Sequence, residues 1–197
     1  MSRSPLHAHP SVASFRAALG RASPWIAAHE ICSYRAASPR WAHSDRLLDG
    51  EGARLQGGRW SAPGIRAAYL CESPEAALSE YLAGARDAGI PDRSGLPAVV
   101  AWGEVRLQRV LDLTRPAACA ALGIDLTRLL ASPWRSENEC GQVSESQAWG
   151  GAARSSGSEA LRVPSAAVAG AVNLVVFVDR LLPGSRLSAH GLSVEHP

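Results

Sequence analysis

The sequence predicts an α+β fold: a single compact domain with mixed or antiparallel sheets and flanking helices. Apolar runs typical of strands are interspersed with strong helix-start signals, and the two do not alternate in the regular βαβ order of a doubly wound fold. Of the 197 residues, 46% are apolar and 19% are charged, so the chain can bury one core and does not have a disordered composition. We find no internal repeat and no domain linker.

A short helix, a strand and a long irregular segment are expected near the N-terminus. Ser11 can cap a helix that Gly20 ends. Residues 31–36 are expected to form a strand. Residues 39–58 are rich in Gly, Arg and Asp and show little periodicity, so we expect an irregular segment of the kind that often carries function.

The clearest helix in the chain follows a short strand. Residues 65–71 are mostly apolar and fit a buried strand. Ser73-Pro74-Glu75 then combines a capping side chain, a proline suited to the first helical position and an acid at the positive end of a helix. We expect this helix to stop at Gly84.

The C-terminal half is predicted to contain strands, helices and two loops. The strands are apolar runs bounded by turn residues, at 98–107, 110–113, 160–163 and 173–178, and the first two could form a hairpin. Helices are expected at 115–122, with Thr114 or Asp112 as the cap and Gly123 as the end, at 126–131, with Asp125 as the cap, and at 144–153. Loops rich in Gly, Pro and Ser are expected at 86–97 and 154–158.

The charged residues exclude several classes of function. All 20 basic residues are arginine, a bias that we attribute to base composition, and the absence of lysine excludes Schiff-base chemistry and phosphate-loop lysines. The net charge is +2 and the arginines are scattered. Because nonspecific nucleic-acid binding usually needs a clustered basic patch, no direct nucleic-acid binding is expected.

The cysteines and the hydropathy pattern indicate a soluble cytoplasmic protein without a metal site. Four cysteines occur without a CxxC pair or a histidine at ligand spacing, so we expect small buried side chains in a reducing compartment: Cys32, Cys71, Cys119 and Cys140. No segment approaches the ~20 apolar residues of a membrane span. The first ten residues lack the apolar core of a signal peptide.

Three residues at nearly even spacing carry the strongest functional signal: Arg59, Tyr69 and Glu80. A cation, an aromatic ring and a carboxylate brought together by strand, turn and helix suit a ligand with phosphates, a flat ring and a developing positive charge. Nicotinamide adenine dinucleotide (NAD) is such a ligand. Each residue alone could be structural: a paired arginine, a core tyrosine and a solvated glutamate.

The surroundings of Glu80 leave room for a ligand, and they fit a solvated glutamate on the back of a helix equally well. Its neighbours three and four residues away are all small, and none is a cation: Ala76, Ala77, Ala83 and Gly84. The glycines before Arg59 also let backbone approach a ligand closely, and arginine offers a rigid fork for phosphate or ribose oxygens.

Further motifs accompany this set along the chain. They are Tyr34-Arg35, Gly57-Gly58-Arg59-Trp60, Tyr69, Ser73-Pro74-Glu75 with Ala77-Leu78 and Glu80, and Val163-Pro164-Ser165-Ala166 followed by Asn173-Leu174. In combination they resemble the RES domain, a family named for an Arg, a Glu and a Ser that supplies the toxins of bacterial RES–Xre toxin–antitoxin systems. The resemblance covers about residues 31–180. We therefore expect a leader with a short helix at 1–30 and a tail at 181–197.

The resemblance implies a fold related to the ADP-ribosyltransferase toxins and implies which residues form the site. By position, Arg59 and Glu80 are the family Arg and Glu, and Ser165 is chosen as the family Ser. The competing serines are Ser155, Ser156 and Ser158. The expected catalytic residues are thus Glu80, Arg59 and Ser165, and the expected NAD-binding residues are Tyr34, Arg35, Arg59 and Tyr69.

The implied activity is cleavage of the bond between nicotinamide and ribose in NAD, which is the substrate. A protein acceptor would make the chain an ADP-ribosyltransferase, water a glycohydrolase and inorganic phosphate a phosphorylase, and the sequence leaves these three open. The implied partner is an Xre-type helix-turn-helix antitoxin that blocks the active site.

Two other classes of function compete with this interpretation. In a non-catalytic interaction module, the residues of the site would form a structural polar network. A ribonuclease toxin is disfavoured because no basic patch is visible and no histidine is paired with the arginine, tyrosine and glutamate of the site.

Overall fold

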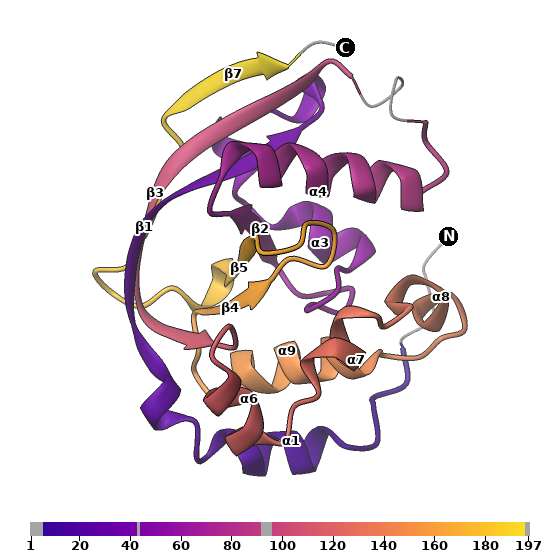
Figure 1. Ribbon diagram of the computed structural model, residues 1–197, viewed down its shortest axis with the longest axis vertical. Coiled ribbons are helices and arrows are strands. Elements are labelled where there is room, and N and C mark those ends of the chain that lie inside the picture. The colour runs from indigo at the N-terminus through magenta and orange to yellow at the C-terminus, as the bar shows by residue number, and fades with distance from the viewer. Residues whose placement is uncertain (1–5, 43, 92–95, 196–197) are drawn as a thin grey trace.

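Two long antiparallel strands, β1 (Ile26–Ala37) and β3 (Ala98–Asp112), form one side of the protein in the computed structural model, which describes residues 6–42, 44–91 and 96–195 (Figure 1). They pair from Ile26 opposite Leu111 to Ala37 opposite Val99. The strand β1 thus begins five residues before the expected position.

The expected hairpin within residues 98–113 is wrong, because β3 is one continuous strand. The pairing shifts between Ala27 and His29 of β1, so that two residues of β3, Gln108 and Arg109, lie opposite one residue of β1. Such a β-bulge accommodates an extra residue without ending the strand. The backbone N–H groups of both bulged residues donate to the carboxylate of Glu159, at 2.7 and 2.9 Å. These bonds take the place of hydrogen bonds to β1 at the bulge.

Three shorter strands connect the two edges of this pair. The antiparallel strands β2 (Ala67–Cys71), β5 (Val172–Phe177) and β4 (Ala160–Pro164) lie side by side in that order. β1 pairs with β2, and β4 pairs in parallel with the end of β3, so the pairings β1–β2–β5–β4–β3–β1 close a ring. The predicted strands 65–71, 160–163 and 173–178 are confirmed to within two residues.

The segment after residue 181, expected as a tail, contains two strands of the same sheet. β6 (Arg186–Leu187) and β7 (Gly191–Glu195) both pair antiparallel with β3. A 3-10 helix at Val178–Arg180 precedes them. The division of the chain at residues 30 and 180 stays a prediction, and parts of the predicted leader (1–5), of the loop at 86–97 (92–95) and of the tail (196–197) lie outside the described residues.

Helices cover one end of the sheet, toward the bottom of Figure 1. They are α1 (Val12–Leu19), α6 (Pro116–Leu122), α7 (Leu126–Leu130), α8 (Trp134–Glu139) and α9 (Glu145–Ser155), with a 3-10 helix at Ser23–Trp25. Phe15 of α1 stacks on Trp149 of α9 with 4.2 Å between ring centroids. These rings belong to the largest apolar cluster, which also contains Val175 and Phe177 of β5.

The residues at the starts of these helices differ in whether their side chains cap the helix. Asp125 accepts from the N–H of Arg128, as expected for α7. Ser144 and Gln147 form a reciprocal capping box at the start of α9. Ser11 precedes α1 without a side-chain capping bond. At α6, Asp112 turns back to Thr114 and does not cap the helix.

The segment 39–58 is more regular than expected. It contains a 3-10 helix at Pro39–Trp41 and the short helices α2 (Ser44–Leu47) and α3 (Glu51–Gln56). The helix α4 (Pro74–Asp87) runs through Gly84, beyond its expected end. A glycine in a helix costs only about 1 kcal/mol, so packing of α4 against β1 outweighs the stop signal.

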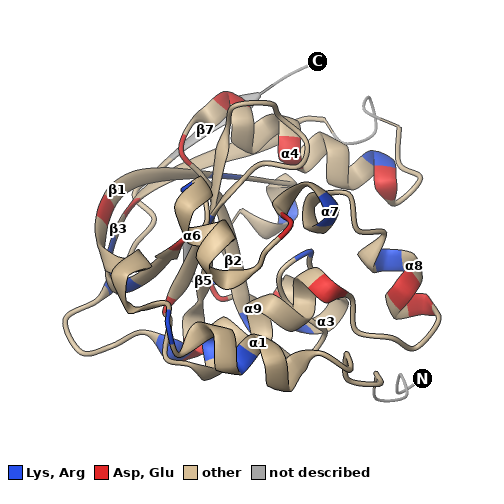
Figure 2. Cartoon of the chain, turned by 60° about the horizontal axis from the view of Figure 1, so that its bottom comes forward, with Lys and Arg blue, Asp and Glu red and all other residues tan. Residues whose placement is uncertain are grey.

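Two further expectations from composition can be compared with the structure. Cys71 and Cys119 are buried as expected, whereas Cys32 and Cys140 are exposed, and all four are free thiols. In the part of the chain that the structure describes, every helix is too short or too polar to cross a bilayer. Basic and acidic residues are interspersed over the elements (Figure 2).

Candidate active site

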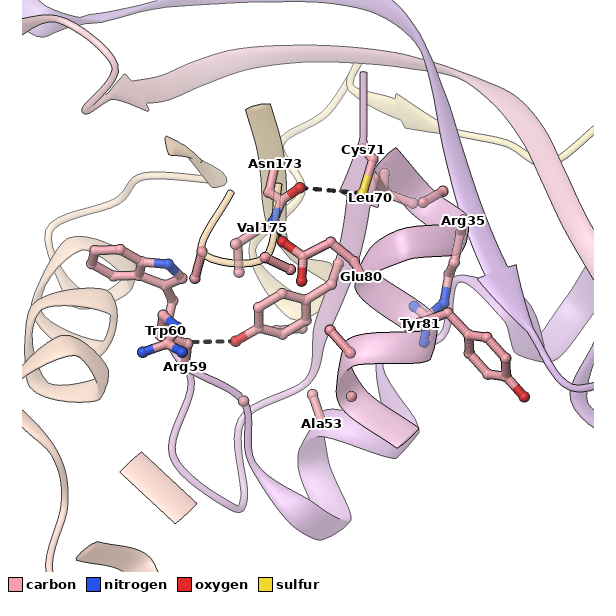
Figure 3. A pocket seen from close by; sticks show the side chains of 18 of the residues that line it. Arg35, Ala53, Arg59, Trp60, Leu70, Cys71, Glu80, Tyr81, Asn173 and Val175 are labelled. Atoms are coloured by element: carbon pink, nitrogen blue, oxygen red, sulfur yellow. Dashed lines mark hydrogen bonds between the residues drawn. The ribbon is translucent and has the colours of Figure 1, made fainter. Parts of the chain in front are cut away.

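A cavity of about 500 Å³ opens between α4, the strands β2 and β5, and the turn at residues 57–60. Four of the residues singled out from the sequence line it: Arg35, Arg59, Tyr69 and Glu80. In Figure 3, Glu80 and Asn173 lie next to each other, with Arg59 and Trp60 to one side and Arg35 to the other. The cavity therefore brings together the cation, the ring and the carboxylate predicted from their spacing.

Glu80 is presented by the helix that the sequence predicted best. The hydroxyl of Ser73 accepts from the N–H of Ala76 at 3.2 Å and so fixes where α4 begins. Glu80 follows two turns later, and the small residues around it, Ala77, Ala83 and Gly84 among them, also line the cavity. Larger side chains at these positions would take up part of the cavity.

Two side chains hold one oxygen of the Glu80 carboxylate. Oε1 accepts from Ser165 Oγ at 2.5 Å and from Asn173 Nδ2 at 2.6 Å. Within the described ranges, Oε2 accepts no hydrogen bond. Hydrogen bonds to an ionised carboxylate are short and strong, so the group is fixed in direction while one oxygen stays available to a ligand.

Ser165 directs its proton to Glu80 because its lone pairs are already used. The hydroxyl accepts from the N–H groups of Ala167 at 3.1 Å and Val168 at 2.8 Å, in the tight turn between β4 and β5. Since a hydroxyl has one proton to donate, these two bonds leave Glu80 as its acceptor.

The competing serines lie elsewhere in the fold. Ser155 and Ser156 are exposed at the end of α9, and Ser158 is buried next to β4. The contact with Glu80 therefore distinguishes Ser165 from these alternatives by geometry. Its role in catalysis stays a prediction.

Asn173 was not recognised as a site residue from the sequence. It lies at the start of β5, opposite Cys71 of β2, and its Oδ1 accepts from the Cys71 thiol at 3.2 Å. This bond sets the amide so that Nδ2 faces Glu80. Burial, and then the nearby charge of Glu80, raise the pKa of Cys71 to about 12, so the thiol keeps the proton that it donates.

Tyr69 is fixed by the turn that carries Arg59. Its hydroxyl accepts from the Trp60 N–H at 3.0 Å and lies 2.9 Å from Ser61 Oγ. Burial raises the pKa of Tyr69 to about 12, so the phenol is neutral at physiological pH. Gly58 permits this contact, because a Cβ at that position would come within 2.4 Å of the phenol oxygen.

Arg59 stands at the tip of a turn that buried side chains hold in place. Gly58 and Ser61 exchange backbone hydrogen bonds across the turn, and Gln147 of α9 donates to the Gly58 carbonyl at 3.0 Å. The guanidinium Nη1 donates to the carbonyls of Ser132 at 2.9 Å and Leu129 at 3.4 Å. Burial lowers the pKa of Arg59, while the charge of Glu80 opposes that effect.

Arg35 and Tyr34 lie on opposite faces of β1, as successive strand residues do. Arg35 lines the cavity, and among the described residues its Nη1 atom is buried without a hydrogen-bond partner. Burial lowers the pKa of this guanidinium. Tyr34 is not among the lining residues and packs against the apolar cluster of Cys71, Ala76 and Ala77. Its assigned part in NAD binding stays a prediction without support from its position.

The helix α8 contributes lining residues that the sequence did not indicate: Trp134 and Arg135. The six-residue helix has no side-chain cap and no apolar periodicity long enough to predict it. Arg135 lies over the Trp134 ring at 4.3 Å from its centroid, and Asp87 at the end of α4 faces it.

The arrangement suits a reaction in which positive charge develops on the ligand. A fixed carboxylate with one free oxygen can stabilise such charge, and arginines can hold anionic groups near it. Within the described residues, no group of three or more His, Cys, Asp or Glu side chains is placed to bind a metal ion.

Comparison with known proteins identifies relatives over most of the chain. The model of the RES domain family matches residues 33–191. NAD(+) phosphorylase MbcT proteins of Mycobacterium tuberculosis and Mycobacterium bovis are 34% identical over 148 residues, which cover 73% of this chain and 73% of each relative. The crystal structure of the M. tuberculosis MbcT-MbcA toxin-antitoxin complex contains a chain that matches with a TM-score of 0.70 and 27% identity, over 95% of this chain and 93% of that chain.

Proposed function

The chain belongs to the RES domain family, and from this premise we propose that it is the toxin of a toxin–antitoxin system that degrades NAD. The name of the MbcT relatives, NAD(+) phosphorylase, supports the substrate, and the α+β fold shared with the MbcT-MbcA complex supports the toxin role. Because NAD is an intracellular metabolite, the proposed reaction takes place in the cytoplasm.

The observation that carries the proposal is the Glu80 carboxylate, held by Ser165 and Asn173 at the wall of a cavity of about 500 Å³. When the bond between nicotinamide and ribose breaks, its electron pair goes to the ring nitrogen and the ribose becomes oxocarbenium-like. A carboxylate near the ribose stabilises charge that is present mainly in the transition state, and this preference accelerates the reaction.

A single carboxylate is sufficient for this chemistry. Nicotinamide is a cation in NAD and leaves as a neutral base, so it needs no proton from a general acid. Most sugar leaving groups require that proton and hence a pair of carboxyl groups. The proposed site has one partly buried acid bonded to Ser165 and Asn173, which matches this requirement.

The other residues have positioning and binding roles in the proposal. Arg59 and Arg35 hold the pyrophosphate or ribose of NAD, and the neutral Tyr69 ring packs on the nicotinamide. Ser165 and Asn173 orient Glu80 toward the ribose. Arg59 and Tyr69 are already fixed by the turn at residues 58–61, so binding orders few groups.

Inorganic phosphate is the acceptor that we propose. A phosphate oxygen attacks the anomeric carbon as nicotinamide departs, which gives ADP-ribose phosphorylated at that carbon and free nicotinamide. The activity named for the MbcT relatives supports this choice over water or a protein side chain.

An antitoxin is the proposed partner, and we propose that it is of the Xre type and blocks the cavity. The structural relative was determined as a toxin-antitoxin complex, which supports an antitoxin as such. A reading frame for a helix-turn-helix protein immediately upstream of the gene would support the Xre type, and co-purification of the two products would test it.

The purified chain can be tested with NAD alone, with NAD and phosphate, and with NAD and a cell lysate. We expect nicotinamide release that depends on phosphate. Release without phosphate would indicate a glycohydrolase, and labelling of lysate proteins from radioactive NAD would indicate an ADP-ribosyltransferase. Intact NAD in all three conditions would refute the enzymatic proposal and favour a non-catalytic interaction module.

A further inference from the structure

Arg135 lies in the wall of the cavity with hydrogen-bond donors that the protein leaves unused. The guanidinium has five N–H donors, and its Nε is buried with no hydrogen-bond partner within the described residues. The carboxylate that faces it, Asp87 Oδ2, is 3.9 Å from Nε, which is beyond hydrogen-bond distance. The Asp87 side chain is also 61% exposed, so solvent weakens its attraction.

The position of Arg135 is nevertheless well defined. The guanidinium stacks on Trp134 at 4.3 Å from the ring centroid, and that ring is 8% exposed. Stacking on an aromatic face holds an arginine without using its in-plane donors. The contact with the ring therefore leaves the N–H donors of Arg135 free to bind a ligand.

A second arginine of the same wall lies close to Arg135. Arg59 also lines the cavity, and the charge of Arg135 lowers its pKa in addition to the larger effect of burial. Arg59 is joined to the segment before α8 through its bonds to the carbonyls of Leu129 and Ser132. Two guanidiniums that repel each other are thus kept together by their surroundings, an arrangement that an anion between them would stabilise.

We propose that Arg135 is a phosphate-binding residue that works with Arg59 as a two-arginine site in the cavity. Planar guanidinium forks match the oxygens of phosphate in pairs, and two of them can hold one phosphate or a pyrophosphate from two sides. The inference rests on the proposed function, in which both NAD and the acceptor carry phosphate.

The phosphate can come from either of two sources, which kinetics distinguish. If the site holds the pyrophosphate of NAD, Arg135→Gln should raise the KM for NAD about ten-fold or more. If it holds the acceptor, the same substitution should raise the KM for inorganic phosphate by that factor. Arg135→Lys keeps the charge without the planar fork and should recover part of either loss.

Arg128→Gln is the matched control. Arg128 lies on the neighbouring helix α7, is 62% exposed, pairs with Glu145 and is not among the lining residues. Its removal changes the net charge equally and should leave both KM values within about two-fold. If Arg135→Gln also leaves both values unchanged in a folded protein, the proposal is wrong.

Binding without turnover separates this inference from the proposed activity. Calorimetric titration with inorganic pyrophosphate and, separately, with inorganic phosphate needs no cleavage of NAD. At least one of them should bind the wild type about ten-fold more tightly than Arg135→Gln. If the wild type does not cleave NAD but still binds one of the two anions more tightly than Arg135→Gln does, the proposed function is wrong and the phosphate site stands. If wild type and Arg135→Gln bind both anions equally, the phosphate site is wrong. Should Arg135→Gln fail to fold, the comparison is made with Arg135→Lys.

Discussion

Two glutamates of this protein, Glu159 and Glu80, differ in the kind of hydrogen-bond donor that holds them and in how many of their oxygens are bonded. Glu159 is fully buried: Oε2 accepts from the N–H groups of Gln108 and Arg109, and Oε1 from that of Leu182 at 2.8 Å. Glu80 lines the cavity and uses side-chain donors, both on Oε1, and its other oxygen accepts no hydrogen bond within the described residues. The first carboxylate is occupied on both oxygens, and the second on one.

The difference separates a structural carboxylate from one suited to chemistry. Glu159, which directly precedes β4, accepts from the β3 bulge and from the segment after β5. Its hydrogen bonds to backbone therefore hold these three parts of the chain together. Glu80 joins α4 to β5 and to the β4–β5 turn while keeping an oxygen free. Buried carboxylates are thus informative through the number and kind of their donors, and burial alone would have ranked Glu159 first.

The same substitution at both positions should give opposite results, and the largest effect is expected on activity at Glu80. In Glu80→Gln the amide oxygen can still accept from Ser165 and Asn173, but the negative charge is lost. We expect NAD cleavage to fall about a thousand-fold or more, with an unchanged melting temperature. Glu75→Gln, exposed on the first turn of α4, is the control. If the Glu80→Gln variant still cleaves NAD, or still arrests growth when expressed, Glu80 does not have the assigned role.

At Glu159 the substitution should affect stability and leave activity intact. The amide NH₂ of Glu159→Gln would face backbone N–H donors, so at least one buried donor loses its partner. We expect the free energy of unfolding to fall by about 2 to 3 kcal/mol in denaturant titration. The activity per folded molecule should stay near that of the wild type, and a large loss of turnover would show that the two glutamates are not separable.

Removal of one donor to Glu80 should have an intermediate effect. Ser165→Ala leaves Asn173 as the remaining donor, so the carboxylate is less well oriented. We expect kcat for NAD cleavage to fall about ten-fold to a hundred-fold, with a smaller change in KM. Ser155→Ala, at the exposed end of α9, is the matched control and should be neutral. A neutral Ser165→Ala would assign the Ser of the family motif elsewhere.

Low pH should reduce the stabilisation that Glu159 gives to the fold. Burial raises the pKa of Glu159, but hydrogen bonds from Leu182, Ser185, Gln108 and Arg109 outweigh it, so the pKa lies below the ordinary value for glutamate. A group whose pKa is lowered by folding stabilises the fold at pH values above its ordinary pKa. That stabilisation is lost as the pH falls through the pKa of the group in the folded protein. The difference in unfolding free energy between wild type and Glu159→Gln should therefore shrink below about pH 5. A constant difference would contradict this.

The smallest effect is expected one bond further from Glu80. Cys71→Ala removes the donor that orients the Asn173 amide, whereas Cys71→Ser replaces it by a hydroxyl. We expect Cys71→Ala to lower kcat about three-fold, with recovery in Cys71→Ser, measured at matched fractions of folded protein. Equal kcat values for both variants would leave Cys71 with a packing role alone.

Local sequence signals predicted the elements whose causes are local. The α4 start at Ser73-Pro74 and the α7 cap at Asp125 depend on side chains within three residues, and both are confirmed. The continuous strand β3 depends on Glu159, about fifty residues away, so the sequence pattern around Gln108 predicted a turn. Short helices such as α8 escaped prediction because tertiary contacts, and not an amphipathic pattern, stabilise them.

The site follows the same rule. Arg59, Tyr69 and Glu80 follow one another at short intervals on connected elements, so their spacing indicated a common pocket. Asn173 and Arg135 reach that pocket from distant parts of the chain. Asn173 belongs to a motif noted from the sequence, but its contact with Glu80 depends on strand register, and the place of Arg135 depends on the path of a short helix.

The contact between Gly58 and Tyr69 has a consequence for how relatives of this protein can diverge. A Cβ at position 58 would lie 2.4 Å from the Tyr69 oxygen and within 2.8 Å of ring carbons, so even phenylalanine at position 69 would clash. A side chain at position 58 thus requires the loss of the ring at position 69. In an alignment of RES domains the two positions should covary: lineages with a larger residue at 58 should have a small one at 69, and should have lost the aromatic wall of the pocket.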